Sequence, residues 1–170
     1  MAIIVQNDAG TVANANSYAD TNFVDDYFSL RGESTWTALS TQNKEIALIK
    51  AWQYIDTAFN FQGYQKTDAQ NTTFPRLGVY SQRGTELSDV ETNIKNAQAE
   101  YALISLTTDF TINQVPSVTS LLKKESRKAD VLSESLEYDT DRGQVIKFSF
   151  PKADFWLKEF LRGNTFKGYY

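Results

Sequence analysis

The sequence contains neither cysteine nor histidine. Without cysteine the chain has no disulfide, no thiolate metal site and no thiol nucleophile. Without histidine it lacks the commonest general base and the commonest transition-metal ligand, which excludes Ser-His-Asp catalysis. No apolar run approaches the roughly 20 residues that span a bilayer, and residues 1–10 lack the features of a secretory signal. We therefore expect a soluble, unexported protein that is not an enzyme, with no catalytic residue, metal, cofactor or membrane contact.

Positive charge is also scarce. The 170 residues include 17 basic and 21 acidic side chains, so the net charge is -4 and the overall field repels a polyanion unless basic residues gather locally. This disfavours a freestanding nucleic-acid binder. Aromatic residues make up 14% of the chain, more than a sparse core needs, which indicates surfaces that another protein covers.

Helical periodicity predicts two helices in the first third of the chain. The first follows a capping box of Ser17 and Asp20 and ends near Gly32. The second begins after Ser40 and is the clearest element in the sequence. We expect its core stripe to be Ile46, Ile49, Trp52, Ile55 and Phe59.

Two further helices are predicted later in the chain. One follows a capping box of Ser88 and Glu91, and the last begins at Pro151 and ends at Gly163. Between them, residues 121–138 fit two antiparallel strands with a reversal near 128–130, and residues 144–150 fit another short strand. The expected fold is mainly α, a bundle of about four helices with a small β-hairpin and an extended C-terminal tail. The expected organisation is one helical domain over 1–163 and a docking tail over 164–170.

The segment NTTFPRLGVYSQRG, residues 71–84, has two interpretations. In the first, Arg76 and Arg83 contact phosphates while Phe74 or Tyr80 stacks on bases, as in single-strand binders. In the second, Pro75 sets a rigid bend, the aromatic residues are buried, and Arg76 satisfies backbone carbonyls or a carboxylate. Because acidic residues flank the loop, we favour the second interpretation, in which Phe74, Pro75 and Arg76 form a loop scaffold.

The only dense basic cluster consists of Lys123, Lys124, Arg127 and Lys128. These residues are candidates to line a DNA channel, or they protect an exposed edge strand from aggregation. Acidic residues follow at once and could pair with them across the hairpin or across a subunit boundary. The sequence leaves both interpretations open.

Three stretches carry a resemblance to a known family. They are ANSYADTNFVDDYFSLRG, TWTALSTQNKEIALIKAWQYID and TTFPRLGVY, in that order. Together they resemble the head-to-tail connector (adaptor, or head completion) proteins of tailed bacteriophages, over about residues 10–110. Similar phage proteins also carry a label as DnaT-like single-stranded-DNA-binding proteins.

The resemblance implies a structural virion protein made in the host cytoplasm and located in the neck. Its subunits would form a dodecameric ring that joins the portal to the tail or the next neck protein and leaves a channel for genomic double-stranded DNA. The C-terminal residues Phe166, Lys167, Tyr169 and Tyr170 would then dock on the portal or on a neighbouring subunit. The alternative function is a single-stranded-DNA-binding module.

Overall fold

The computed structural model describes residues 2–110, 122–127, 134–138 and 150–162. It divides the chain into two compact units, residues 1–110 with 150–170 and residues 111–149. The sequence-based division at residue 163 stays a prediction, since residues 163–170 lie outside the described part.

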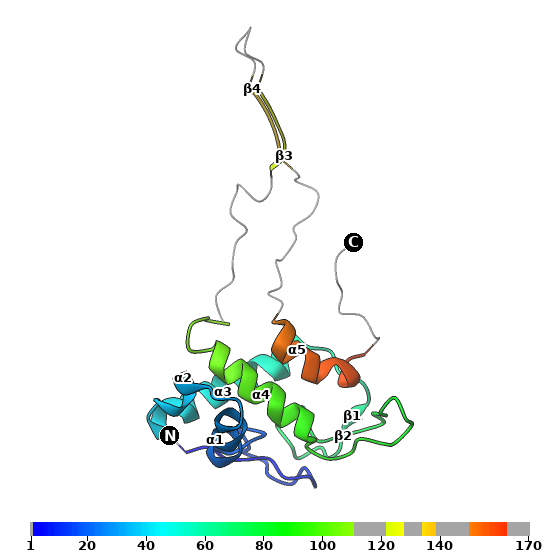
Figure 1. Ribbon diagram of the computed structural model, residues 1–170. Coiled ribbons are helices and arrows are strands. Elements are labelled where there is room, and N and C mark those ends of the chain that lie inside the picture. Colours follow the sequence, from blue (N-terminus) through cyan, green and yellow to red (C-terminus); the bar gives the residue numbers. More distant parts are fainter. Residues whose placement is uncertain (1, 111–121, 128–133, 139–149, 163–170) are drawn as a thin grey trace. The chain divides into compact units, whose positions relative to one another are not determined.

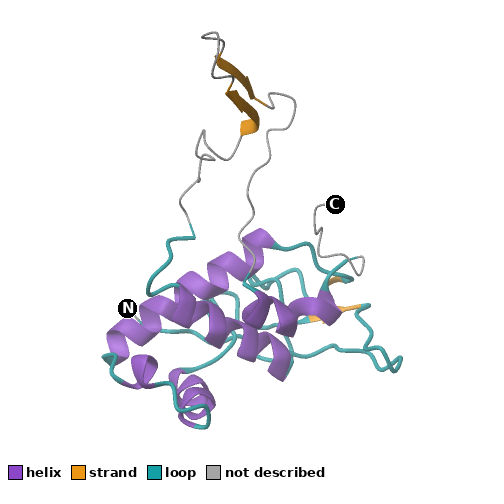
Figure 2. Ribbon diagram, turned by 45° about the horizontal axis from the view of Figure 1, so that its top comes forward, coloured by secondary structure: helices purple, strands orange, loops and turns teal. Residues whose placement is uncertain are grey.

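The first unit is built from helices, so the predicted mainly α class is confirmed. In chain order the described helices are α1 (Thr21–Ser29), α2 (Ser34–Thr37), α3 (Thr41–Ala58), α4 (Thr92–Ile104), α5 (Pro151–Leu157) and the 3₁₀ helix η2 (Lys158–Phe160). α4 packs against both α3 and α5 (Figure 1). Two short antiparallel strands, β1 (Tyr64–Gln65) and β2 (Arg76–Leu77), lie among the loops (Figure 2).

Local signals placed two helix starts correctly. The Ser40 hydroxyl accepts a hydrogen bond from the Asn43 N–H at 3.3 Å, so α3 begins where the sequence predicts. Pro151 occupies the first turn of α5, where its missing N–H costs nothing. Both signals act within one turn of chain, which is why they can be recognised without tertiary information.

Two predicted capping boxes were wrong. The first helix is capped by Asp20, whose carboxylate accepts from the Phe23 N–H at 2.7 Å, while the Ser17 hydroxyl donates to the Ala19 carbonyl instead. At the start of α4, Glu91 occupies the cap position without a side-chain cap hydrogen bond. The carbonyl of Ser88 accepts from a lysine of the preceding loop, so tertiary contacts fix this segment.

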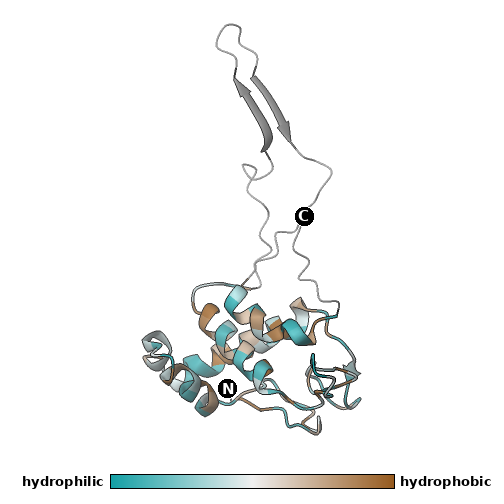
Figure 3. Ribbon diagram, turned by 45° about the vertical axis from the view of Figure 1, so that its right-hand side comes forward, coloured by the Kyte–Doolittle hydropathy of each residue, from teal (hydrophilic) through white to brown (hydrophobic). Residues whose placement is uncertain are grey.

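The core face of α3 is shifted from the predicted one. Its buried residues are Ala47, Leu48, Ala51 and Ile55. Of the predicted stripe only Ile55 is buried, and Ile46 is 42% exposed. This face combines two small side chains with Leu48 and Ile55, and α3 packs against α4, where the Tyr54 ring lies 5.0 Å from that of Tyr101. Figure 3 shows that each helix carries both hydrophobic and hydrophilic residues.

Buried polar pairs join the helices. Three tyrosine hydroxyls donate hydrogen bonds to carboxylates on other segments, in the pairs Tyr18–Asp56, Tyr27–Glu100 and Tyr101–Asp154. Burial raises the pKa of each of these three hydroxyls, and the carboxylate that each one faces raises it further. The Lys152 ammonium lies 3.0 Å from the buried Glu100 carboxylate, so this carboxylate has both a hydrogen-bond donor and a cation.

The second unit contains the predicted hairpin. Strands β3 (Leu122–Arg127) and β4 (Glu134–Tyr138) pair in antiparallel register, with Lys124 opposite Glu137 and Arg127 opposite Glu134. The register is irregular between Leu122 and Lys124. The expected reversal and residues 144–149 of the expected strand at 144–150 lie outside the described residues, and Phe150 occupies the cap position of α5.

Candidate nucleic-acid interface

The Arg76 side chain is held by three backbone carbonyls. Its Nε donates to the Gln62 carbonyl at 2.6 Å and its two terminal nitrogens donate to the carbonyls of Gly63 at 2.7 Å and Thr73 at 3.3 Å. A side chain at Gly63 would meet the Leu77 carbonyl oxygen at 2.0 Å, so this approach of β1 to β2 requires glycine. Arg76 is therefore fixed in place by the strand pair that carries it.

Phe74 and Pro75, which precede this arginine in the sequence, are buried. The Phe74 ring makes edge-on contacts with Tyr18, Phe61 and Phe160, at centroid distances of 5.9, 4.8 and 5.5 Å. Phe74 is 1% exposed and cannot stack on a base. Tyr80 and Arg83 are exposed.

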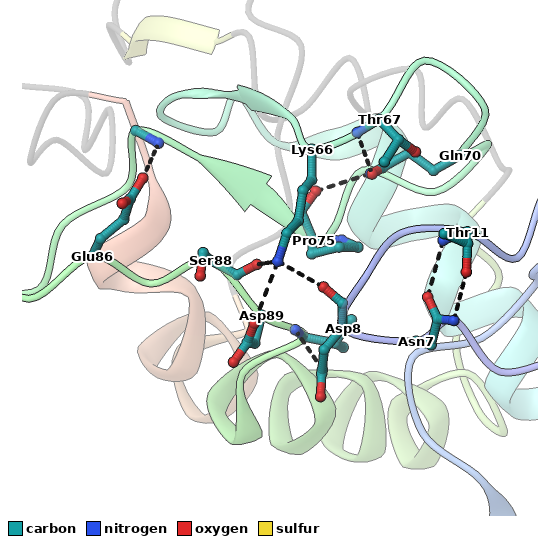
Figure 4. Close-up of polar contacts among 12 residues, drawn as sticks. Asn7, Asp8, Thr11, Lys66, Thr67, Gln70, Pro75, Glu86, Ser88 and Asp89 are labelled. Atoms are coloured by element: carbon teal, nitrogen blue, oxygen red, sulfur yellow. Dashed lines mark hydrogen bonds and ion pairs between the residues drawn. The ribbon is translucent and has the colours of Figure 1, made fainter.

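Lys66 links the long loop between α3 and α4 to two segments that are distant in the sequence. Its ammonium group donates to the carbonyls of Asp8 and Ser88, each at 2.9 Å, and lies 3.5 Å from the Asp89 carboxylate (Figure 4). The Asp8 carboxylate in turn accepts from the Val90 N–H at 3.0 Å. The N-terminal arm, the long loop and the start of α4 are thereby joined at one point.

A recess of about 470 Å³ opens where three segments meet. These are the end of α3, the loop before β2, and the chain that follows η2. Backbone hydrogen bonds hold the segments together, from the Gln62 N–H to the Phe160 carbonyl at 2.8 Å and from the Arg162 N–H to the Asn60 carbonyl at 2.9 Å. The residues that line the recess are Phe59, Asn60, Phe61, Thr73, Arg76 and Arg162.

The recess carries two cations without a carboxylate partner. Within the described part of the chain, neither Arg76 nor Arg162 has a carboxylate oxygen within ion-pair distance. Burial lowers the pKa of Arg76, and the nearby Tyr18 and Asp56 oppose that shift. Of the five N–H groups of a guanidinium, Arg76 gives three to carbonyls, which leaves two for a ligand.

Asp56 lies behind the recess and is already engaged. Its carboxylate accepts from the Tyr18 hydroxyl and from the Thr73 N–H, the latter at 2.9 Å. Burial raises the pKa of Asp56 despite these hydrogen bonds. The ionised Asp56 carboxylate therefore weakens the positive field of the recess but forms no ion pair with either arginine.

An aromatic wall completes the recess. Phe59 is half-buried, and its ring packs edge-on against Tyr54 at 5.8 Å between centroids. The Phe61 ring lies 6.1 Å from that of Phe59. Two guanidinium groups beside a supported aromatic ring can bind a phosphate and the face of a base together.

Only one of the predicted site residues contributes to this recess, namely Arg76. Lys123, Lys124 and Arg127 lie on β3 in the other unit. Lys128 and the predicted docking residues Phe166, Lys167, Tyr169 and Tyr170 lie outside the described residues. Sequence reasoning missed Arg162, because nothing in its neighbourhood marks it and only the fold brings it beside Arg76.

The part of the chain that the structure describes offers no group of three or more potential metal-ligating side chains. It also has no helix with the length and hydropathy to cross a membrane.

The fold and recess define a mainly helical protein with a compact cationic and aromatic site. A family model described as "Putative DnaT-like ssDNA binding protein" matches residues 1–169, and the chain belongs to this family. No curated protein and no solved structure matches the chain significantly.

Proposed function

We propose that this protein binds single-stranded DNA through the recess formed by the end of α3, the loop before β2 and the residues after η2. The observation that carries the proposal is the pair Arg76 and Arg162, which lack carboxylate partners among the described residues and lie beside Phe59. The description of the family to which the chain belongs supports the same function.

The geometry suits a flexible strand better than a duplex. A single strand can turn one nucleotide out of its stack, so that a phosphate reaches the arginines while the base lies on an aromatic ring. Arg76 is held by three carbonyls before any ligand arrives, so little side-chain entropy is lost on binding. Arg162 is exposed and can close on the phosphate from the other side.

The number of phosphate contacts determines how the affinity depends on salt, and the net charge of -4 lowers the affinity itself. Two phosphate contacts on a single strand predict a slope of about -1.4 in a plot of log affinity against log salt concentration. The overall field and Asp56 both oppose the approach of the strand, so we expect modest affinity that is strongest at low salt.

Fluorescence anisotropy with a labelled single-stranded oligonucleotide at several salt concentrations tests the proposal. Arg162→Ala should weaken binding about tenfold and lower the magnitude of the salt slope by roughly 0.7. Arg83→Ala is the matched control, since Arg83 is an exposed arginine outside the recess. Absence of binding by the unaltered protein at low salt, or equal losses in the two variants, would overturn the proposal.

The second candidate is a subunit of a ring that connects a phage portal to the tail and passes the genome through its bore. It is favoured by the β3–β4 hairpin, which belongs to a separate unit between α4 and α5 in the sequence and in which Lys124 is paired with Glu137 and Arg127 with Glu134. Leu30, 86% exposed, adds apolar surface that a neighbour could cover. In this function, copies of the subunit bind one another to form the ring in the virion neck. The ring binds the portal on one side and the tail-side protein on the other.

Molar mass from light scattering, with and without portal protein, tests this second function. A ring or a stable portal complex is the expected result. A monomer at tens of micromolar protein that does not bind the portal contradicts it. The two functions are separable, because Arg162→Ala should leave the molar mass unchanged.

A further inference from the structure

We infer that the single strand continues from the recess along the exposed side of α5 and η2, where Phe155 stacks on a base and Lys158 binds a phosphate. The inference rests on the proposed function and assigns two further binding residues to it. We call Phe155 and Lys158, together with Arg162 at the recess, the α5 surface.

Phe155 is an apolar helix residue that the fold leaves open. Its side chain is 66% exposed. Among the described aromatic residues its ring contacts only that of Trp156, at 5.6 Å between centroids and 74° between ring planes. Trp156 is half-buried and packs against the core, so Phe155 has a firmly held neighbour. An accessible aromatic ring on a rigid helix is the stacking surface that a nucleobase requires.

Lys158 lies one helical turn after Phe155. Residues three apart in a helix share one side, and Lys158 is exposed like Phe155. Its ammonium group has no carboxylate within ion-pair distance among the described residues. Lys152, one turn before Phe155, differs because its ammonium lies 3.0 Å from the Glu100 carboxylate. We therefore assign a phosphate to Lys158 and none to Lys152.

The two carboxylates of the same segment are held by the protein. Asp154 is buried, and it accepts from the Tyr101 hydroxyl and from the Phe150 N–H, the latter at 2.9 Å. Glu159 is half-buried and accepts from the Asn93 side chain on α4 at 2.6 Å. The exposed side of the segment therefore carries cations and a ring, which lets it attract a strand although the net charge is -4.

The α5 surface leads directly to the recess. Arg162 is the second residue after η2 and lines the recess, and the Gln62 N–H fixes η2 there by donating to the Phe160 carbonyl at 2.8 Å. From Phe155 to Arg162 the chain advances on the order of 12 Å, at about 1.5 Å per α-helical and 2.0 Å per 3₁₀ residue. Stacked nucleotides follow one another at about 3.4 Å, so roughly four nucleotides span this length.

The experiment measures the affinity of the full-length protein and its variants for a labelled oligo-dT of about 12 nucleotides by fluorescence anisotropy. Three phosphate contacts instead of two predict a salt slope of about -2.1 instead of -1.4. Lys158→Gln should lower the magnitude of this slope by roughly 0.7. Phe155→Ala should weaken binding about fivefold or more without changing the slope, and Phe155→Tyr, which keeps the ring, should bind like the unaltered protein.

Two matched controls lie outside the recess and the α5 surface. Tyr80→Ala removes another exposed aromatic ring, and Lys50→Gln removes an exposed lysine on α3. Both should keep the affinity and the salt slope of the unaltered protein. A duplex of the same length provides a third comparison. Paired bases offer no face to the ring, so Phe155→Ala should leave the affinity for the duplex unchanged, and an equal loss for duplex and single strand contradicts stacking.

The outcomes separate this inference from the proposed function. If the unaltered protein does not bind the oligonucleotide at low salt, both fail. If Arg162→Ala weakens binding but Phe155→Ala and Lys158→Gln do not, the inference is wrong and the proposed function stands. If Phe155→Ala instead lowers the molar mass of an oligomer, Phe155 lies between copies of the chain, and the inference is also wrong. Melting curves establish that the variants are folded, and the salt slope of Lys158→Gln provides the test if Phe155→Ala is not.

Discussion

The side-chain oxygen of Gln98, in the middle of α4, accepts a hydrogen bond from the backbone N–H of Tyr18 at 2.9 Å. The same oxygen accepts from the Ala19 N–H at 2.9 Å. The amide nitrogen donates to the Ser17 hydroxyl at 2.8 Å and to the Leu48 carbonyl at 2.9 Å. Gln98 is fully buried, so one amide satisfies four groups that water cannot reach and joins the N-terminal segment and α3 to α4.

Gln98→Leu should lower the free energy of unfolding by about 3 kcal/mol or more, because it leaves two N–H groups, a hydroxyl and a carbonyl buried without this partner. Urea denaturation measures the change. Gln53→Leu, on the exposed face of α3, is the matched control and should change stability by less than about 0.5 kcal/mol. Similar losses in the two variants would contradict the role assigned to Gln98.

Lys66→Met should destabilise the protein by about 1–2 kcal/mol, because two carbonyls lose a charged donor and three segments lose a common anchor. Amide exchange should increase first near Asp8 and Ser88. Lys50→Met, an exposed lysine on α3, serves as the control and should leave both the melting temperature and exchange nearly unchanged. Unchanged exchange near Asp8 in Lys66→Met would show that the anchor is dispensable.

Glu91→Ser should stabilise the protein by about 0.5–1 kcal/mol. Burial raises the pKa of Glu91, and the nearby Asp89, Glu159 and Asp8 raise it further, so its charge is unfavourable where it lies. Serine removes that charge and also supplies the cap hydrogen bond that Glu91 does not make. Glu91→Gln removes only the charge, so chemical denaturation of both variants separates the two contributions. A loss of stability in Glu91→Ser would show that helix-dipole attraction outweighs them.

Asp56 should make stability fall as pH rises. Burial raises its pKa in the folded protein, so the folded state binds more protons than the unfolded state from the unfolded carboxyl pKa, about 3.9, up to the folded value. Across that window the free energy of unfolding of the unaltered protein should fall relative to that of Asp56→Asn. The difference between the two proteins isolates Asp56 from the other carboxylates. A difference that grows with pH would mean that its hydrogen bonds outweigh burial.

Arg76→Lys should lower the melting temperature, because an ammonium group cannot reach the three carbonyls that the guanidinium joins. The expected loss is about 1–3 kcal/mol. Arg162→Lys is the comparison, since the guanidinium of Arg162 makes no hydrogen bond within the described residues. Equal melting temperatures of Arg76→Lys and Arg162→Lys would contradict the scaffolding role of Arg76.

Parts of the fold could be predicted because their causes are local. Ser40 caps α3 and Pro151 starts α5 through interactions within a single helical turn. The mixture of charged and β-branched or apolar residues over 121–138 likewise predicted a pair of antiparallel strands, which the structure has as β3 and β4. Helix α2 was not predicted, because a single turn is too short to show a hydrophobic period.

The burial of α3 shows where local patterns stop being sufficient. Ile46, Ile49 and Trp52 recur at helical spacing, and so do Ala47 and Ala51 beside them. Periodicity shows that a helix has an apolar side, but the choice between neighbouring stripes depends on the shape of the partner helix. In the folded protein the buried side of α3 consists of Ala47, Leu48, Ala51 and Ile55.

The sequence by itself determined the mainly helical class, the hairpin, and the absence of cysteine and histidine chemistry, because composition and short-range spacing are sufficient for each. Only the tertiary structure decided the candidate site. Arg76, Asn60 and Arg162 belong to different segments, and backbone hydrogen bonds between those segments bring them to one recess. Such long-range bonds depend on the packed core beneath them, and no local pattern records which distant residues they will join.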